Sequence, residues 1–305
     1  EDHYCAQAAA LIRKACGRDD LAVHFLVGGT QANLTVIAAA LRPHQAALCP
    51  ESGHINVHET GAVEATGHKV LTVPSDDGKI TAKQVRDTVL GHRADSSFEH
   101  MVQPGMVYIS HPTEFGTLYT LKELTEISET CKQKGLYLFV DGARLGYGLM
   151  SKQSDLKIEE IAELCDVFYI GGTKVGALCG EAVVFTKNNR PAHFMNSVKK
   201  RGALLAKGRL LGVQFDALFT DGLYFEIGAK ANAQAARLRA TLDALGVLMR
   251  YDSPTNQQFP ITYGFATGGY SPPRITYFPL RAETILRYGM FCSTSWTVSA
   301  LLMTP

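Results

Sequence analysis

Short apolar runs alternate with helical stretches from residue 5 to residue 185, and this alternation constrains the fold more than any other feature of the chain. Seven runs are predicted strands: 22–27, 46–49, 70–73, 105–109, 136–140, 166–170 and 181–185. A helix over 5–16 precedes them, and two later helices begin with capping-box spacing, Thr81 with Gln84 and Thr120 with Glu123. Strands that alternate with helices form βαβ units. We therefore predict an α/β fold with a mostly parallel seven-stranded sheet sandwiched by helices.

The pattern changes after residue 190. Two long helices are predicted over 198–220 and 227–245, and residues 253–291 are rich in Pro, Gly, Tyr and Thr with short β-like pieces. A chain of 305 residues has room for two domains. We predict a large α/β domain over 1–222 and a smaller C-terminal α+β domain over 223–305.

Composition excludes several classes of protein. With 46% hydrophobic and 19% charged residues, the sequence is globular rather than disordered or fibrous. The formal net charge of +1 provides no field that would attract nucleic acid or an anionic membrane. No apolar run approaches the roughly 20 residues of a membrane span. The seven scattered cysteines form no zinc motif or disulfide framework. We expect a cytoplasmic protein with reduced thiols and no metal, and, because the chain opens at Glu1 without Met, further residues at one or both ends.

Asp141 follows an apolar strand in the stretch FVDGARLGYG. Open α/β sheets place ligand-binding groups at the carboxyl ends of their strands. A carboxylate there could pair with a buried cation or a protonated ring nitrogen. The alternative is a helix N-cap or a structural turn, because Asp-Gly is a common turn pair.

Lys174 lies in a glycine-rich loop between two apolar strands, in FYIGGTKVGALCGEAVVF. A lysine in a low-dielectric pocket has a lowered pKa and can form a Schiff base. The alternative is a lysine in a surface turn, where most lysines lie.

The loop from Gly28 through Gly29, Thr30 and Gln31 also joins a predicted strand to a predicted helix. Backbone N–H groups and the positive end of the helix dipole make such a loop a phosphate site. It is neither a Walker A loop nor a GxGxxG pattern, and an N-cap at Thr30 would explain it equally well.

His54, in ESGHINVHETGA, lies at a strand–helix junction and could stack on a planar cofactor. A satisfied core histidine is the alternative. His58 follows four residues later, but no third ligand is evident, so a zinc site is not predicted.

Together these four features match the needs of one cofactor, pyridoxal 5'-phosphate. That cofactor requires a cradle for its phosphate, a ring to stack on, an anion at its pyridine nitrogen and an amine for its aldehyde. All four features lie at strand ends of one predicted sheet.

Five motifs carry a resemblance to a known family: GGTQAN at 28–33, SGHINVHETGA at 52–62, VDGARLGYG at 140–148, GGTKVG at 171–176 and TNQQF at 255–259. The chain resembles the threonine aldolase group, which is placed with the β-eliminating aromatic amino acid lyases. The resemblance covers most of the chain. It implies the aspartate-aminotransferase-type fold, also called the PLP-dependent transferase-like fold or fold type I.

The resemblance also implies residue roles. Lys174 would form the Schiff base with pyridoxal phosphate, Asp141 would bond the pyridinium nitrogen, His54 would stack on the ring, Arg144 would contact the 3-oxygen, and Gly29, Thr30 and Gln31 would hold the phosphate. Lys207, or alternatively Arg209, would add a basic side chain to the phosphate. Arg287 would bind the substrate carboxylate, with Arg274 and Arg281 as the other candidates.

The chain departs from the family at one point. Many aldolases carry a second active-site histidine in a segment similar to ENTHN, where this chain has ISHPTEFGT. Glu114 falls at the position of that histidine, and His111 lies three residues earlier. The candidates for the catalytic base are therefore His54, His111, Glu114 or a water molecule that they order.

The activity implied is aldol cleavage of L-threonine, L-allo-threonine or another β-hydroxy-α-amino acid to glycine and an aldehyde. One alternative is a β-eliminating lyase or aminotransferase that uses the same cofactor, and a second is a non-catalytic protein of the same fold. The family further implies a homodimer or homotetramer with active sites at the subunit interface. The initial segment EDHYC and the helix around Lys207 are candidate interface pieces.

Overall fold

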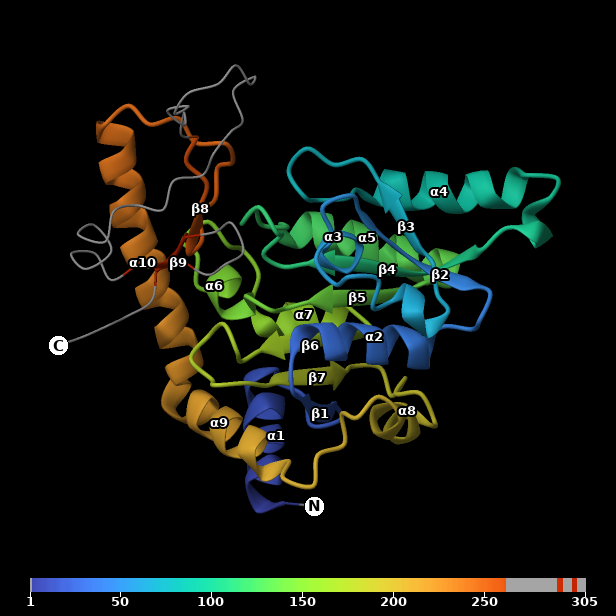
Figure 1. Ribbon diagram of the computed structural model, residues 1–305, viewed down its shortest axis with the longest axis horizontal. Coiled ribbons are helices and arrows are strands. Elements are labelled where there is room, and N and C mark those ends of the chain that lie inside the picture. The colour runs from blue at the N-terminus through green and yellow to red at the C-terminus, as the bar shows by residue number, and fades with distance from the viewer. Residues whose placement is uncertain (1, 262–289, 293–297, 301–305) are drawn as a thin grey trace, which may run out of the picture.

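The computed structural model describes residues 2–261, 290–292 and 298–300. Its main feature is a seven-stranded sheet with the order β1-β7-β6-β5-β4-β2-β3 (Figure 1). The strands are β1 Ala22–Leu26, β2 Gln45–Pro50, β3 Val70–Val73, β4 Gln103–Ser110, β5 Tyr137–Asp141, β6 Val167–Gly171 and β7 Glu181–Phe185. The pairs among β3, β2, β4, β5 and β6 are parallel. The prediction of a mostly parallel seven-stranded sheet is confirmed.

Strand β7 is the exception, since it runs antiparallel to both β6 and β1. The connection over 172–180 contains no helix. A parallel return would need a crossover of a dozen or more residues, so this short loop turns the chain back on itself. The loop is the one that carries Lys174.

The helices are α1 His3–Ala15, α2 Gly29–Ala40, α3 His54–Val57, α4 Ala82–Ala94, α5 Leu121–Lys134, α6 Leu145–Leu149, α7 Ile158–Leu164, α8 Phe194–Lys200, α9 Arg209–Phe219 and α10 Leu223–Ala244. Reciprocal capping boxes begin α4 and α5, as predicted. A small antiparallel sheet has the order β8-β10-β9, with β8 Gln257–Gln258, β9 Met290–Cys292 and β10 Val298–Ala300. Among the described helices, none combines the length and the apolar character that a membrane crossing requires.

The single helix predicted over 198–220 is wrong. Helix α8 ends at Lys200 and α9 begins at Arg209, with an irregular segment between them. Gly202 has φ +69°, in the left-handed region that ends a right-handed helix. The second predicted helix, 227–245, corresponds to α10, which begins at Leu223. The proposed domain boundary after residue 222 falls at the start of α10 and stays a prediction.

Helices cover both faces of the sheet, as the strand alternation requires. Within β4, Met106 and Tyr108 lie in one core cluster, with side chains of α2 and α8. Val107 and Ile109 lie in the other cluster, with side chains of α1, α4, α5, α7, α9 and α10. In Figure 1 the long α10 lies along one side of the sheet, beside α6 and α9.

The ends of β5 and β6 approach each other more closely than side chains would allow. The Gly171 N–H donates to the Gly142 carbonyl at 2.9 Å. A Cβ on Gly142 would lie 2.0 Å from the Tyr169 carbonyl oxygen, and one on Gly171 would lie 2.3 Å from that of Ala143. Glycine is therefore required at both positions. This close approach brings the segment after Asp141 against the start of the Lys174 loop.

We expect Gly142→Ala to destabilise the fold by about 1–3 kcal/mol, because backbone must move to admit the methyl group. The control is Gly91→Ala in α4, where an added Cβ meets nothing within 4 Å. Alanine there should stabilise the helix by roughly 0.5–1 kcal/mol. Urea unfolding of both variants measures the difference, and equal unfolding midpoints would contradict the packing described above.

Candidate active site

A cavity of about 330 Å³ opens at the carboxyl edge of the large sheet. Its walls come from the segments that follow β1, β2, β4, β5 and β6, together with the start of β7. The structure brings these predicted site residues together around it: Gly29, Thr30, His54, Glu114, Asp141, Arg144 and Lys174. Residues from five separate parts of the sequence thus share one space.

Asp141 is a buried carboxylate, 3% exposed, that accepts hydrogen bonds from four donors. Its Oδ1 accepts from the Tyr169 hydroxyl at 2.5 Å and from the Ala143 N–H at 2.9 Å. Its Oδ2 accepts from the Tyr108 hydroxyl and from Asn33 Nδ2, the latter at 3.2 Å. Burial alone would raise the pKa of Asp141, but the electrostatic influence of the neighbouring His54 ring and these donors outweigh burial and hold the pKa below its usual value. The site therefore contains a fixed negative charge at neutral pH.

The Ala143 N–H belongs to the turn that follows Asp141, so this hydrogen bond is the one expected of a structural turn residue. The geometry of Asp141 fits both a turn residue and a ligand-binding carboxylate.

Lys174 exposes surface, but that surface lines the cavity, where protein atoms replace much of the water. Burial and the nearby Arg144 lower the pKa of Lys174 to about 8, against the opposing charges of Asp141, Glu181 and Glu114. A lysine with such a pKa has a substantial neutral, nucleophilic fraction near neutral pH.

The N-terminus of α2 faces the same space. Its N-cap is Gly28, which has no side chain to bond the first N–H groups, so the alternative of an N-cap at Thr30 is wrong. Uncapped N–H groups and the helix dipole favour a bound anion. Gln31 does not line the cavity; its Oε1 accepts from the Val27 N–H at 3.2 Å.

The charges in the cavity fit an anionic, planar cofactor such as pyridoxal phosphate. Within the part of the chain that the structure describes, neither Lys174 nor Arg144 forms an ion pair with a carboxylate. The side chains of Lys174 and Arg144 and the N-terminus of α2 can therefore bind a negatively charged group. Asp141 is negatively charged and can pair with a protonated ring nitrogen.

Glu114 connects the segment after β4 to α3. Its Oε1 accepts from the Ser110 hydroxyl at 2.6 Å and from the His54 N–H at 3.0 Å. Burial raises the pKa of Glu114, and the charge of Asp141 adds to the rise. Its Oε2 is buried and has no partner among the described residues, so this carboxyl can take up or release a proton.

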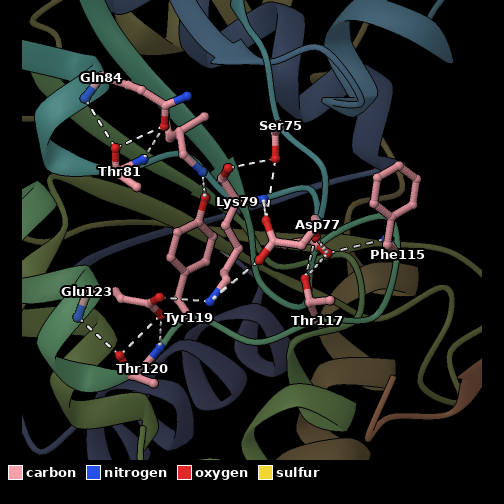
Figure 2. Close-up of polar contacts among 12 residues, drawn as sticks. Ser75, Asp77, Lys79, Thr81, Gln84, Phe115, Thr117, Tyr119, Thr120 and Glu123 are labelled. Atoms are coloured by element: carbon pink, nitrogen blue, oxygen red, sulfur yellow. Dashed lines mark hydrogen bonds and ion pairs between the residues drawn. The ribbon is translucent and has the colours of Figure 1, made fainter. Parts of the chain in front are cut away.

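A polar network braces the loop that carries Glu114 (Figure 2). The Thr117 hydroxyl donates to the Asp77 carbonyl at 2.7 Å, and Lys79 Nζ lies 2.8 Å from a carboxylate oxygen of Glu123. The Ile80 N–H donates to the Tyr119 hydroxyl at 2.8 Å. These contacts join the segment before α4 to the segment before α5, which contains Glu114.

Other predicted residues lie elsewhere. His111 is 1% exposed and does not line the cavity; burial lowers its pKa to about 4, so the ring is neutral. Lys207 is exposed in the segment between α8 and α9, away from this cavity. Arg209 lies beside α1, with its guanidinium 4.7 Å from the Tyr4 ring centre. The three candidates for the substrate carboxylate, Arg287, Arg274 and Arg281, lie outside the described residues.

Sequence reasoning missed five polar residues that complete the site: Asn33, Glu59, Tyr108, Tyr169 and Glu181. Tyr108 and Tyr169 lie on β4 and β6, the two neighbours of β5, and buried tyrosines need partners for their hydroxyls. The need of these hydroxyls for a partner could have indicated that both tyrosines contact Asp141, but only once the strand order was known. Glu181 lines the cavity and accepts from the Gly172 N–H at 3.1 Å, and burial raises its pKa to about 8.

This sheet, with a lysine loop and a buried carboxylate at its carboxyl edge, has the fold of the aminotransferase-like α/β enzymes. A structure described as alanine–glyoxylate aminotransferase from Nostoc sp. matches it with a TM-score of 0.60 at 16% identity, over 85% of this chain and 71% of that chain. The chain belongs to the beta-eliminating lyase family, whose model matches residues 1–263. The resemblance drawn from the motifs is confirmed.

Two relatives show the likeness in detail. The low specificity L-threonine aldolase of Pseudomonas sp. (strain NCIMB 10558) is 33% identical over 267 residues, which are 85% of this chain and 74% of that protein. The structure of the threonine aldolase of Leishmania major is 43% identical, with a TM-score of 0.83, and the match covers 98% of this chain and 83% of that one.

We expect Lys174 to titrate with a midpoint near pH 8 in protein freed of bound small molecules. Reductive methylation with ¹³C-formaldehyde followed by NMR at increasing pH measures this, and Lys174→Arg identifies the resonance. A midpoint near the roughly 10.4 of free lysine would show that the cavity does not desolvate the amine.

Proposed function

We propose that the protein is a pyridoxal-phosphate-dependent aldehyde-lyase, which cleaves L-threonine, L-allo-threonine or another β-hydroxy-α-amino acid to glycine and an aldehyde. The observation that carries the proposal is the convergence of Lys174, Asp141 and the α2 N-terminus on one cavity. The names of the Pseudomonas and Leishmania relatives support the reaction type.

Bound in this cavity, pyridoxal phosphate would supply an electron-withdrawing ring conjugated to the substrate amine. Lys174 is the amine that would attach the cofactor. Asp141 would hold the proton on the ring nitrogen by charge pairing, and His54 would pack on the ring. The α2 N-terminus, at Gly29 and Thr30, would bind the phosphate, and Arg144 would bind the 3-oxygen.

The remaining task is to remove the proton of the substrate β-hydroxyl. His54 and Glu114 line the cavity and can accept a proton there, whereas His111 does not reach it. A base positioned in this way contributes about 10²–10⁴-fold to a rate. A non-catalytic role is disfavoured because Lys174 and Asp141 are both present in the cavity.

We propose further that copies of the chain assemble through the surface formed by α9 and the Lys174 loop. Exposed apolar side chains gather there, with Leu178 94%, Leu210 62% and Val213 41% exposed. The Gln214 side chain joins the two parts, since it accepts from the Leu178 N–H at 2.6 Å. Apolar groups this exposed are typical of an interface. A homodimer or homotetramer would bury them, and the Lys207 segment, adjacent in sequence, would reach the neighbouring copy.

With pyridoxal phosphate and L-threonine, the purified protein should produce glycine and acetaldehyde in equal amounts. Lys174→Ala should lower turnover by at least about 10³-fold, as expected for a lost nucleophile, and Asp141→Ala should also be strongly impaired. The control is Lys122→Ala in α5, whose side chain is 85% exposed.

Formation of 2-oxobutyrate instead would indicate β-elimination, the alternative that the family name raises. Full activity of Asp141→Ala would contradict the proposed role of the ring-nitrogen partner.

Leu210→Glu should shift the protein to a smaller species in light scattering, because a buried charge disfavours the interface. The control is Leu248→Glu, since Leu248 is 64% exposed but lies beyond the other end of α10. An unchanged mass for Leu210→Glu would place the interface elsewhere.

A further inference from the structure

Glu59 is a buried carboxylate directly behind the cavity. Its side chain is 0% exposed, and it does not line the cavity itself. Its Oε1 lies 2.8 Å from His54 Nδ1 and accepts from Asn33 Nδ2 at 2.7 Å. A buried carboxyl group loses its hydration, so hydrogen bonds of this kind are needed to compensate for it.

Asn33 links this carboxylate to Asp141. The Asn33 side chain is completely buried, and its Nδ2 lies within hydrogen-bond distance of both carboxylates, 2.7 Å from Glu59 and 3.2 Å from Asp141. The two hydrogens of the Asn33 amide are thus donated to two carboxyl groups. If the amide were rotated by 180°, its oxygen, which can only accept, would face both of them. The two carboxylates and the amide form one connected unit with His54.

His54 is held from two directions. Its backbone N–H donates to Glu114 at 3.0 Å, and its Nδ1 faces Glu59 Oε1, an oxygen that already accepts from Asn33 Nδ2. The Nδ1 atom therefore carries the proton, and in the neutral ring Nε2 is the atom with a free lone pair. The ring lines the cavity. The charged or titratable groups around it are Glu59, Glu114, Asp141 and His58, whose ring centre is 5.4 Å away.

We propose that Glu59 is a positioning residue that fixes the tautomer and orientation of His54, so that Nε2 accepts the proton of the substrate β-hydroxyl. Asn33 couples this pair to Asp141. The inference rests on the proposed aldol cleavage and selects His54 among the candidate bases.

The O–H bond breaks and its proton moves to Nε2, while the oxygen's electron pair forms the aldehyde C=O. The Cα–Cβ bond breaks with its electron pair left on Cα, where a proton from solvent completes glycine. His54 then releases the proton it took from the hydroxyl to solvent and returns to its starting state, so the proton count is unchanged.

The first test reads the tautomer in the purified full-length protein labelled with ¹⁵N-histidine. Long-range ¹H–¹⁵N NMR should show His54, identified by the loss of its signals in His54→Asn, with the proton on Nδ1. In Glu59→Leu, which removes the acceptor, the proton should shift at least partly to Nε2. An unchanged tautomer in Glu59→Leu would overturn the inference, whatever the substrate of the protein is.

The second test is kinetic, with L-threonine as substrate. Glu59→Leu should lower kcat by about 10²-fold or more, with KM changed less than about threefold, because Glu59 does not touch the cavity. Glu59→Gln keeps the shape and an acceptor oxygen, so it should retain the Nδ1 tautomer and lose less activity. The control is Glu64→Gln, an exposed residue five positions later.

The two proposals fail separately. If the wild-type protein made no glycine from any β-hydroxy amino acid while the tautomer shifted as expected, the proposed function would fall and the positioning of His54 would stand. If Glu59→Leu kept wild-type kcat while aldol cleavage was established, the positioning role would fall alone.

Discussion

The negative charge of Asp141, buried at the end of β5, is the constraint on which the rest of the site depends. An ionised carboxyl inside a protein is tolerated only when donors surround it. Here the donors are the hydroxyls of Tyr108 and Tyr169, the Ala143 N–H and the Asn33 amide. These donors lie on β4, on β6, in the turn after β5 and on α2. The strand order and the position of α2 are therefore both needed to stabilise this one charge.

Burial shifts the pKa values of the groups around this charge in opposite directions. It raises the pKa of Tyr108 and Tyr169, with the charge of Asp141 adding to the rise, so both remain hydroxyl donors. It lowers the pKa of Lys174 to about 8 and raises that of Glu181 to about 8. An amine and a carboxyl with shifted pKa values thus line one cavity, and such shifts are concentrated at functional sites.

Local signals in the sequence were sufficient for much of this fold. The strands over 70–73 and 181–185 have the predicted bounds, and both capping boxes form, because short-range periodicity and hydrogen bonding determine them. The cavity residues next to glycine-rich turns were predictable for the same reason. Glu59 and Tyr108 were not, since their importance comes from which strands and helices become neighbours. The reversal of β7 and the break near Gly202 likewise depend on tertiary packing and on a single backbone angle.

The place of β1 at the edge of the sheet affects how the protein is made. Ala22 pairs with Phe185, although the intervening chain forms nearly the whole of the remaining sheet. During synthesis at roughly 5–20 residues per second, β1 therefore waits on the order of ten seconds or more for its partner strand. The anion-binding turn that follows β1 cannot be placed beside the lysine until then. A ribosome-bound chain that ends before β7 therefore cannot complete the cavity, because β7 contributes Glu181 to its wall and pairs with β1.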